Sequence, residues 1–210
     1  FAMKEIDKIL DEKEKIFWEG KPKFWPFFLG SSILTTIFGL FWMVFLIPFI
    51  VLPAINIAHG GLIGYGIFLL PHFWIGIILV FGIPIYQIFS YKHVYYAITN
   101  KRVILQKGLI GRDFEIVDFD KITNEEVNVG VFDKLFGNSS GSILISTAGS
   151  FTYMRGRPVQ RPYTISNIEN PYDVFKFFKK VSYDVKTDIH YPNKYRPKTN
   201  PGYRTDYKAK

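Results

Sequence analysis

The sequence contains no cysteine, and it carries no Asp, Glu, Lys or Arg between Lys23 and Lys92, a stretch of 68 residues (24–91). The lack of cysteine excludes disulfide scaffolds, thiolate catalysis and cysteine-based zinc sites. A soluble domain does not leave so long a segment uncharged, because its surface needs charges every few positions. Hydrophobic residues make up 48% of the chain and aromatic residues 18%, which excludes a mostly disordered protein. We therefore expect an integral membrane protein rather than an ordinary cytosolic enzyme.

The uncharged segment, 24–91, is predicted to form a transmembrane hairpin. A helix needs about 20 apolar residues to cross a hydrocarbon core roughly 30 Å thick, so the segment has room for two spans. We place the first span at about residues 27–52, with Pro48 and Pro53 near its end, and the second at about 67–89. The glycine-rich residues between them are poor helix formers and are expected to form the connecting loop.

The basic residues predict the orientation of this hairpin. Six lysines precede the first span and four Lys or Arg residues follow the second within 92–107, whereas the connecting loop has none. Basic residues flank transmembrane helices on the cytoplasmic side. Both termini are therefore expected in the cytoplasm, in a multi-pass protein of the cell (plasma) membrane.

The segment before the hairpin, 3–23, is predicted to be a cytoplasmic amphipathic segment that forms a short helix. Its apolar residues fall close to one helical face, and its six basic and six acidic residues balance. Such a helix can lie on the membrane surface or pack against the soluble part of its own chain. The sequence leaves both alternatives open.

Residues 92–183 are predicted to form a cytoplasmic domain of antiparallel strands with one helix packed over them. A tight turn is expected at Asn100-Lys101. A helix is expected over 171–183, because Asn170 suits an N-cap, Pro171 suits a first turn, and an apolar stripe follows at Val174, Phe175, Phe178 and Val181. Strands are expected at 93–99, 102–107, 114–119, 126–131, 142–147 and 163–166.

Several motifs follow one another in an order that resembles a known family. They are EKIFWEGKP (14–22), YYAITNKR (95–102), Gly108 after the second strand, a turn FDKLFG (132–137) and SILIST (142–147). Together they are similar to the pleckstrin-homology-like (PH-like) membrane proteins of bacteria and archaea, the YdbS/YdbT-like proteins, over roughly residues 12–183. The resemblance implies an α+β membrane protein. In it, a two-helix transmembrane hairpin precedes a seven-stranded, half-open antiparallel β-barrel capped by a C-terminal α-helix.

Neither the residues nor the resemblance indicates an enzyme. No phosphate-binding glycine loop is present, and no histidine is placed for Ser/His/Asp hydrolysis, since His93 follows the hairpin directly and His190 lies in the C-terminal tail. His59 and His72 fall near the predicted outer surface of the membrane, where ordinary loop histidines are the simpler interpretation. We expect no catalytic residues, no metal site and no cofactor.

The basic residues are the one indication of a binding site. Lys101 and Arg102 occupy the first hairpin turn of the domain, near the place where eukaryotic PH domains bind phosphates. Arg155, Arg157 and Arg161 follow later in a stretch rich in Gly and Pro, and their guanidinium groups suit phosphate. The tail, 184–210, is basic and rich in Pro and Tyr. It is predicted to be flexible or to act as an arm over a neighbouring subunit.

Two functions fit these features. In the first, the PH-like domain is a non-enzymatic scaffold for protein assembly that self-associates as a homo-oligomer among membrane lipids and binds an unidentified protein partner. In the second, it binds or senses anionic lipid headgroups at the cytoplasmic leaflet through the basic residues named above. A third alternative is an enzyme subunit whose chemistry resides in a partner. A nucleic-acid partner is not expected.

Overall fold

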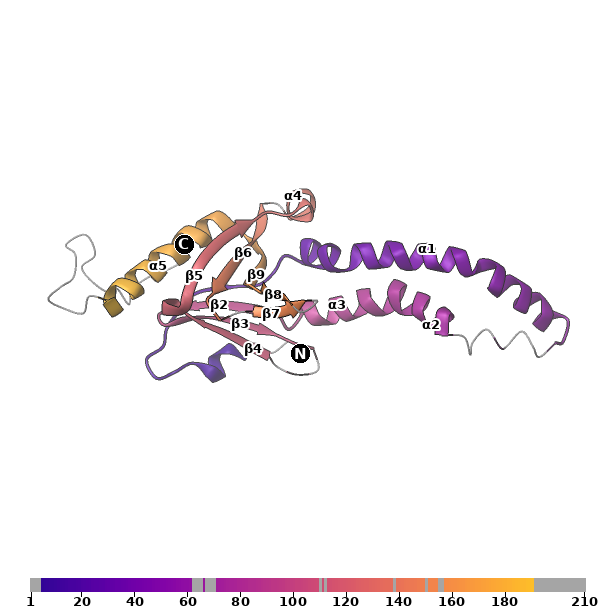
Figure 1. Cartoon of the computed structure of the whole chain (residues 1–210), viewed down its shortest axis with the longest axis horizontal. Helices are drawn as coiled ribbons and strands as arrows, with labels where there is room; N and C mark the ends of the chain where they lie inside the picture. The colour runs from indigo at the N-terminus through magenta and orange to yellow at the C-terminus, as the bar shows by residue number, and fades with distance from the viewer. Residues whose placement is uncertain are drawn as a thin grey trace. The chain divides into compact units, whose positions relative to one another are not determined.

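The computed structural model describes residues 5–61, 66, 71–109, 111, 113–137, 139–149, 151–154 and 157–190, without the side chains of 151–160, 189 and 190. The chain divides into two compact units, one formed by Phe1–Phe27 with Lys92–Lys210 and the other by Phe28–Tyr91. The fold is α+β. Two long apolar helices precede most of the antiparallel strands, and a C-terminal helix ends the described part of the chain (Figure 1).

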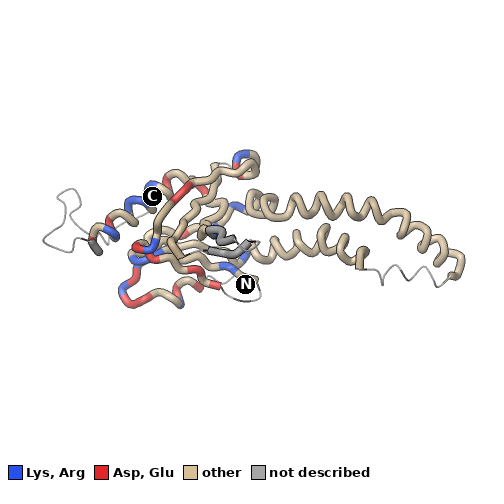
Figure 2. Tube along the Cα trace, viewed as in Figure 1, with Lys and Arg blue, Asp and Glu red and all other residues tan. Residues whose placement is uncertain are grey.

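The helical unit contains two helices that are long and apolar enough to cross a membrane. The first is α1, Phe24–Ala58. The second consists of α2, Pro71–Ile77, a π-helical turn at Ile78–Gly82, and α3, Ile83–Tyr91, which follow one another without a break. Figure 2 shows that neither helix carries an Asp, Glu, Lys or Arg residue along its length.

Helix α1 is longer than the predicted first span of 27–52, because Pro48 and Pro53 lie inside the helix and do not end it. A proline removes one backbone hydrogen bond, whereas ending a helix in apolar surroundings leaves several backbone groups without partners. The predicted loop accordingly begins later, at the turn His59–Gly60. Residues 62–65 and 67–70 of the predicted loop and second span lie outside the described residues.

The two apolar helices contact each other at glycines. A side chain at Gly39 of α1 would lie 2.7 Å from the Cβ of Leu79, and a side chain at Gly76 of α2 would lie 2.5 Å from the Sδ of Met43. Close approach at small residues is how helices pack in lipid. The π-helical turn ends at Gly82, two residues before Pro84, and its wider turn accommodates a residue that cannot donate a backbone hydrogen bond.

Two antiparallel sheets and a hairpin make up the other unit. The first sheet has the order β1 (Ile16–Gly20), β2 (Tyr95–Thr99), β3 (Arg102–Lys107) and β4 (Asp113–Asp118). The second has the order β5 (Ile122–Asn128), β6 (Ser140–Thr147) and β9 (Tyr163–Glu169). The hairpin pairs β7 (Phe151–Met154) with β8 (Arg157–Gln160). A short helix α4 (Val131–Phe136) precedes β6, and α5 (Pro171–His190) follows β9.

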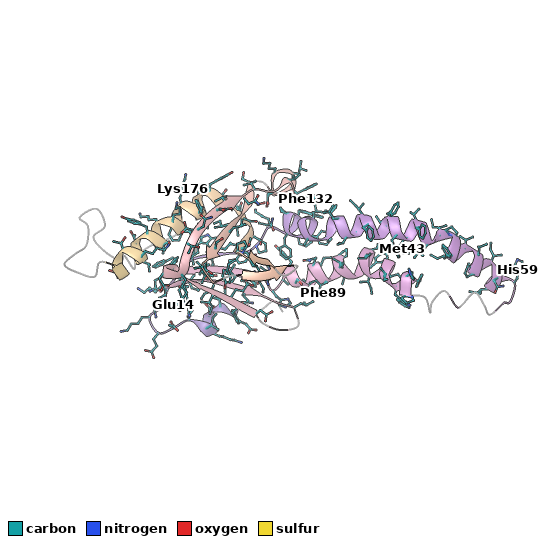
Figure 3. All side chains as sticks on the ribbon, viewed as in Figure 1. Glu14, Met43, His59, Phe89, Phe132 and Lys176 are labelled. Atoms are coloured by element: carbon teal, nitrogen blue, oxygen red, sulfur yellow. The ribbon has the colours of Figure 1, made fainter. Side chains whose placement is uncertain are left out.

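The main core of this unit lies between the two sheets and α5. Ile98 of β2, Ile143 of β6 and Phe178 of α5 are completely buried in it, and the rings of Phe119 and Phe178 lie 6.0 Å apart. The predicted apolar stripe of α5 is confirmed, since Val174, Phe178 and Val181 are buried and Phe175 packs against them. Lys176 lies on the exposed side of the same helix (Figure 3). The helix thus covers the core as its sequence pattern predicts.

A second, smaller core covers the other face of the first sheet. Ile6, on a 3-10 turn at Ile6–Ile9, is fully buried against Ala97 of β2 and Ile104 of β3. The N-terminal segment therefore belongs to the folded unit at two places, through this turn and through β1. The short helix of this segment packs against the chain's own domain, which is one of the two predicted alternatives, but the helical face predicted to include Ile16 and Phe17 is wrong. Ile16 and Phe17 lie in a strand that pairs with β2, with Gly20 opposite Tyr96, and β-branched and aromatic residues suit such a strand.

Other predictions also need correction. The strand expected at 126–131 is β5, which ends at Asn128, so that Val131 begins α4. The sequence FDKLFG, expected as a turn, is mostly the helix α4, whose start is capped by Gly130 and Asp133. Helix α5 extends to His190, beyond the predicted 171–183 and into the predicted tail. The rest of that tail, 191–210, lies outside the described residues.

Candidate functional site

The predicted phosphate-binding turn, between β2 and β3, is occupied by the N-terminal segment of the same chain. Arg102 donates hydrogen bonds from Nε to Glu14 Oε1 (3.1 Å) and from Nη2 to Glu14 Oε2 (2.9 Å). Its Nη2 also donates to the carbonyl of Ile9 (3.0 Å) and lies 3.4 Å from Asp11 Oδ1. The side chain of Glu14 has no exposed surface, and that of Arg102 is 16% exposed. This guanidinium group therefore binds two carboxylates of its own chain, the buried Glu14 and the half-exposed Asp11.

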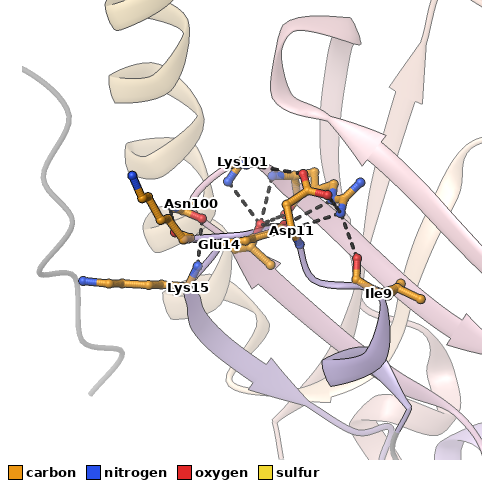
Figure 4. A network of polar contacts seen from close by, with 9 residues as sticks. Ile9, Asp11, Glu14, Lys15, Asn100 and Lys101 are labelled. Atoms are coloured by element: carbon orange, nitrogen blue, oxygen red, sulfur yellow. Dashed lines mark hydrogen bonds and ion pairs between the residues drawn. The ribbon is translucent and has the colours of Figure 1, made fainter.

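The remaining residues of the turn contact the same segment (Figure 4). Lys101 Nζ lies 3.3 Å from Asp11 Oδ2, in an ion pair that is about half exposed. Asn100 Oδ1 accepts a hydrogen bond from the backbone amide of Lys15 (2.9 Å), and the Asn100 amide donates to the Lys15 carbonyl (3.0 Å). The turn thus binds residues 9–15 through both charges and backbone hydrogen bonds.

Glu14 is the centre of this network, and its surroundings set its pKa. Burial alone would raise the pKa of its carboxyl group. The hydrogen bonds from Arg102, the Asp11 amide and the Thr99 hydroxyl outweigh burial, so the pKa lies below its ordinary value of 4.5. Glu14 is accordingly ionised at neutral pH and accepts hydrogen bonds from three neighbours.

This lowered pKa predicts a loss of stability in acid. Because the pKa is lower in the folded chain than in the unfolded chain, Glu14 contributes stability that is fully present above the ordinary value of 4.5 and is lost as the pH falls through the folded value. The variant Glu14→Gln should lack this part of the acid dependence. The Tm of the detergent-purified protein, followed from neutral pH to about pH 3, measures it. Equally steep Tm profiles for the variant and the parent protein would contradict the assignment.

The other predicted basic cluster is only partly described. Arg157 begins β8, opposite Met154 in the hairpin, and Arg161 is exposed immediately after that strand. Arg155 and the side chain of Arg157 lie outside the described residues. A phosphate site formed by Arg155, Arg157 and Arg161 therefore stays a prediction.

A second buried polar network surrounds Asp133 of α4, whose exposed fraction is 4%. Asp133 Oδ1 accepts hydrogen bonds from the Ser140 hydroxyl (2.5 Å) and from Asn167 Nδ2 (3.0 Å), and Oδ2 accepts one from the Gly130 amide (3.1 Å). A side chain at Gly137 would collide with the Ser140 hydroxyl. The network attaches α4 to the start of β6 through Ser140 and to β9 through Asn167. The hydrogen bond from Gly130 caps the start of α4.

Asn167 connects this network to the start of the first apolar helix. Its backbone has the left-handed φ of 52°, which asparagine tolerates. The backbone amide of Asn167 donates to the Ser142 hydroxyl (3.0 Å). Its backbone carbonyl accepts a hydrogen bond from the backbone amide of Lys23 (2.7 Å), the residue before α1. Asp133 and Lys23 therefore both bond to Asn167.

Sequence reasoning missed this second network. The spacing of Gly130 and Asp133 is that of an N-cap and its third helical residue, and that spacing could have indicated the start of a helix. Nothing local indicates Asn167, which is 34 residues away from Asp133.

Metal-binding and cysteine chemistry find no support in the described part of the chain. The sequence has no cysteine, and the described residues contain no group of three or more His, Asp or Glu side chains that could hold a metal ion. The acidic residues of the two networks, Asp11, Glu14 and Asp133, all accept hydrogen bonds or pair with cations of the same chain. The first network attaches the N-terminal segment to the β2–β3 turn, and the second attaches α4 to β6 and β9.

Comparison with known proteins assigns the family. The chain is 19% identical to a DUF1696 family protein with a pleckstrin-homology domain from Shewanella loihica PV-4, known from a crystal structure, over 43% of this chain and 69% of that chain, with a TM-score of 0.29. No curated protein matches the chain. The profile of the family described as Bacterial PH domain matches residues 32–170, which include most of α1 and every strand from β2 to β9. On this match, the chain belongs to the bacterial PH domain family.

Proposed function

We propose that this chain is a non-enzymatic integral membrane protein whose PH-like domain acts in the cytoplasm as a scaffold for protein assembly, and that it self-associates. The two apolar helices, 35 residues in α1 and 21 residues in Pro71–Tyr91, are about 52 and 31 Å long at 1.5 Å per residue. Both lengths suffice for a hydrocarbon core of about 30 Å. The lysines that flank the pair favour cytoplasmic termini.

The chain connections favour a domain that stays close to the membrane surface. Only residues 21–23 separate β1 from α1, and only residues 92–94 separate α3 from β2. Strands β1 and β2 are neighbours, with Gly20 opposite Tyr96, so both connections leave from adjacent strands. The seven strands of the two sheets, together with α5, support the half-open barrel that the family resemblance implies.

The observation that carries the scaffold proposal is the occupation of the β2–β3 turn. A headgroup reader needs free cations at its phosphate site, because a phosphate must displace whatever the cations already bind. Here Arg102 binds the buried carboxylate of Glu14, and Lys101 pairs with Asp11. The turn thus serves to attach residues 9–15. This use of the turn favours a domain that works through protein contacts over one that reads phosphates there.

The helices offer surface for self-association. Their described residues are largely exposed in the single chain, including Leu34, Phe41 and Phe45 of α1 and Phe81 of the π-helical turn. A side chain at Gly30 of α1 would meet no atom within 4 Å, so another helix can approach the backbone closely there. In lipid, such small residues favour helix–helix contacts.

Co-purification of two tagged copies tests the proposal. Full-length chains with different tags are expressed together, solubilised in a mild detergent and captured on one tag. We expect the second tag to be recovered at a fixed ratio, and we expect Lys101→Ser and Arg161→Ser to leave that ratio unchanged, because neither cation is needed for assembly. Recovery of the captured copy alone would refute self-association. Copies that separate in detergent but associate in vesicles only with anionic lipid, and only when both cations are present, would favour headgroup binding.

A further inference from the structure

Helix α4 has an inverted polarity for a surface helix. Its acidic residue, Asp133, is buried, whereas Val131, Leu135 and Phe136 are 69%, 67% and 51% exposed. A surface helix of a soluble protein turns its apolar residues inward and its charges outward. Three large apolar side chains on one six-residue helix therefore form an exposed apolar patch, hereafter the α4 patch, that the folding of this unit does not explain.

This orientation of α4 is fixed by hydrogen bonds. Asp133 accepts one from Ser140, one from Asn167 and one from the amide of Gly130. Turning the helix over to bury the α4 patch would expose this carboxylate and leave three donors without their acceptor. Buried donors without acceptors are costly. The outward direction of the patch is consequently built into the fold.

The position of α4 indicates what covers the patch. The side-chain amide of Asn167 donates a hydrogen bond to Asp133, and the backbone carbonyl of Asn167 accepts one from the backbone amide of Lys23. Lys23 is the last residue before α1, and α1 is the helix proposed above as the first membrane span. One residue, Asn167, thus separates the buried acid of α4 from the point at which the chain enters the bilayer. Trp25, in the first turn of α1, is also exposed, as aromatic residues at a membrane interface commonly are.

We propose that α4 inserts the α4 patch into the interfacial region of the lipid leaflet at which α1 begins, so that the PH-like domain contacts the bilayer directly. This inference rests on the membrane anchoring of the proposed function. An apolar helix face enters the boundary between headgroups and acyl chains, and flanking lysines extend to the phosphates. Lys134, exposed on the same helix, supplies such a cation. Three side chains are too few for a stable protein interface, so lipid is the occupant that fits.

The absence of cysteine allows a direct test with single labelled positions. Leu135→Cys on α4 and Tyr183→Cys on α5 are prepared in the full-length chain, since both positions are exposed. Each is labelled with an environment-sensitive dye and reconstituted into phosphatidylethanolamine–phosphatidylglycerol vesicles. We expect the dye at position 135 to be quenched several-fold less by iodide than the dye at 183, and to be quenched by lipids that carry a shallow spin label. If Leu135→Cys does not fold, Val131→Cys gives the same readout.

Two results would overturn the proposal. Equal iodide quenching at 135 and 183 would mean that α4 faces water. Protection from iodide without quenching by spin-labelled lipid would mean that a protein surface, such as a second copy, covers the α4 patch. Carbonate extraction of the same vesicles distinguishes a failure of the α4 proposal from a failure of the membrane anchoring in the proposed function. A protein that stays in the membrane with a water-exposed dye refutes only the α4 contact, whereas a protein released by carbonate refutes the membrane anchor as well.

Discussion

Replacing Glu14 by alanine is expected to lower the free energy of unfolding by about 3–5 kcal/mol, the usual effect of removing one partner of a buried ion pair. The change leaves the guanidinium group of Arg102 without its carboxylate. It also removes the acceptor of the Asp11 backbone amide (2.8 Å) and one of the two acceptors of the Thr99 hydroxyl (2.7 Å), which can still donate to the Arg102 carbonyl (2.9 Å). Because Arg102 is 16% exposed, water compensates for part of the loss, and we expect the lower end of that range.

The measurement is urea denaturation of the full-length protein in a mild detergent, followed by the circular dichroism of its strands. Glu12→Ala is the matched control, since Glu12 is an exposed acid two residues away, and it should change stability little. Hydrogen exchange should also become faster in Ile16–Gly20 (β1) of Glu14→Ala, because the network holds the segment that leads into that strand. A Glu14→Ala variant as stable as Glu12→Ala would contradict the role of this ion pair.

Replacing Asp133 by alanine is expected to have the second large effect, lowering the free energy of unfolding by about 3 kcal/mol. The change leaves three donors without an acceptor, namely Ser140, Asn167 and the amide of Gly130. An unsatisfied buried donor costs about 1–3 kcal/mol. We expect the three donors together to cost an amount near the low end of this range for each, because water can enter the gap left by the carboxylate and accept their hydrogen bonds.

Thermal and urea unfolding of the full-length protein measure this loss, with Asp120→Ala as control because Asp120 is exposed at the corner between β4 and β5. Asp133→Asn keeps one oxygen acceptor and should be less destabilising than Asp133→Ala. Faster hydrogen exchange in α4 and around Asn167 should accompany the loss. Unchanged exchange there would show that the Asp133 network does not hold α4 in place.

Local patterns in the sequence predicted a large part of the fold. The strand at 102–107 is β3 with the same bounds, because a turn at Asn100-Lys101 and a run of β-branched and aliphatic residues define it locally. The face of α5 that packs on the core was visible from the spacing of Val174, Phe178 and Val181. Two apolar helices followed from the absence of charge over 24–91. In each case, residues close in sequence carry the signal.

The failures concern residues whose partners are distant in sequence. Ile16 and Phe17 fit a helical face as well as a strand, and only the pairing with β2, on the far side of 68 uncharged residues, decides for the strand. The run 126–131 contains alternating valines, but β5 takes its register from β6 and ends at Asn128. Local periodicity cannot distinguish such alternatives, because tertiary pairing overrides it.

The candidate site shows the same division. Lys101 and Arg102 were recognised as a basic turn, but their partners Asp11 and Glu14 lie about 90 residues earlier in the chain. From the sequence, the two cations therefore resemble a free phosphate site. The structure assigns their charges to the attachment of the N-terminal segment. The second network was not predicted at all, since Asp133 and Asn167 meet only when α4 and β9 are in place.

The mass of the purified protein tests the central claim, self-association of a membrane-anchored scaffold, most directly. Light scattering of the full-length chain in several mild detergents, corrected for bound detergent, gives the mass of the protein component alone. The account predicts one defined multiple of the 24.4 kDa chain in each detergent, unchanged in Lys101→Ser. A protein mass of 24.4 kDa in every detergent would contradict it.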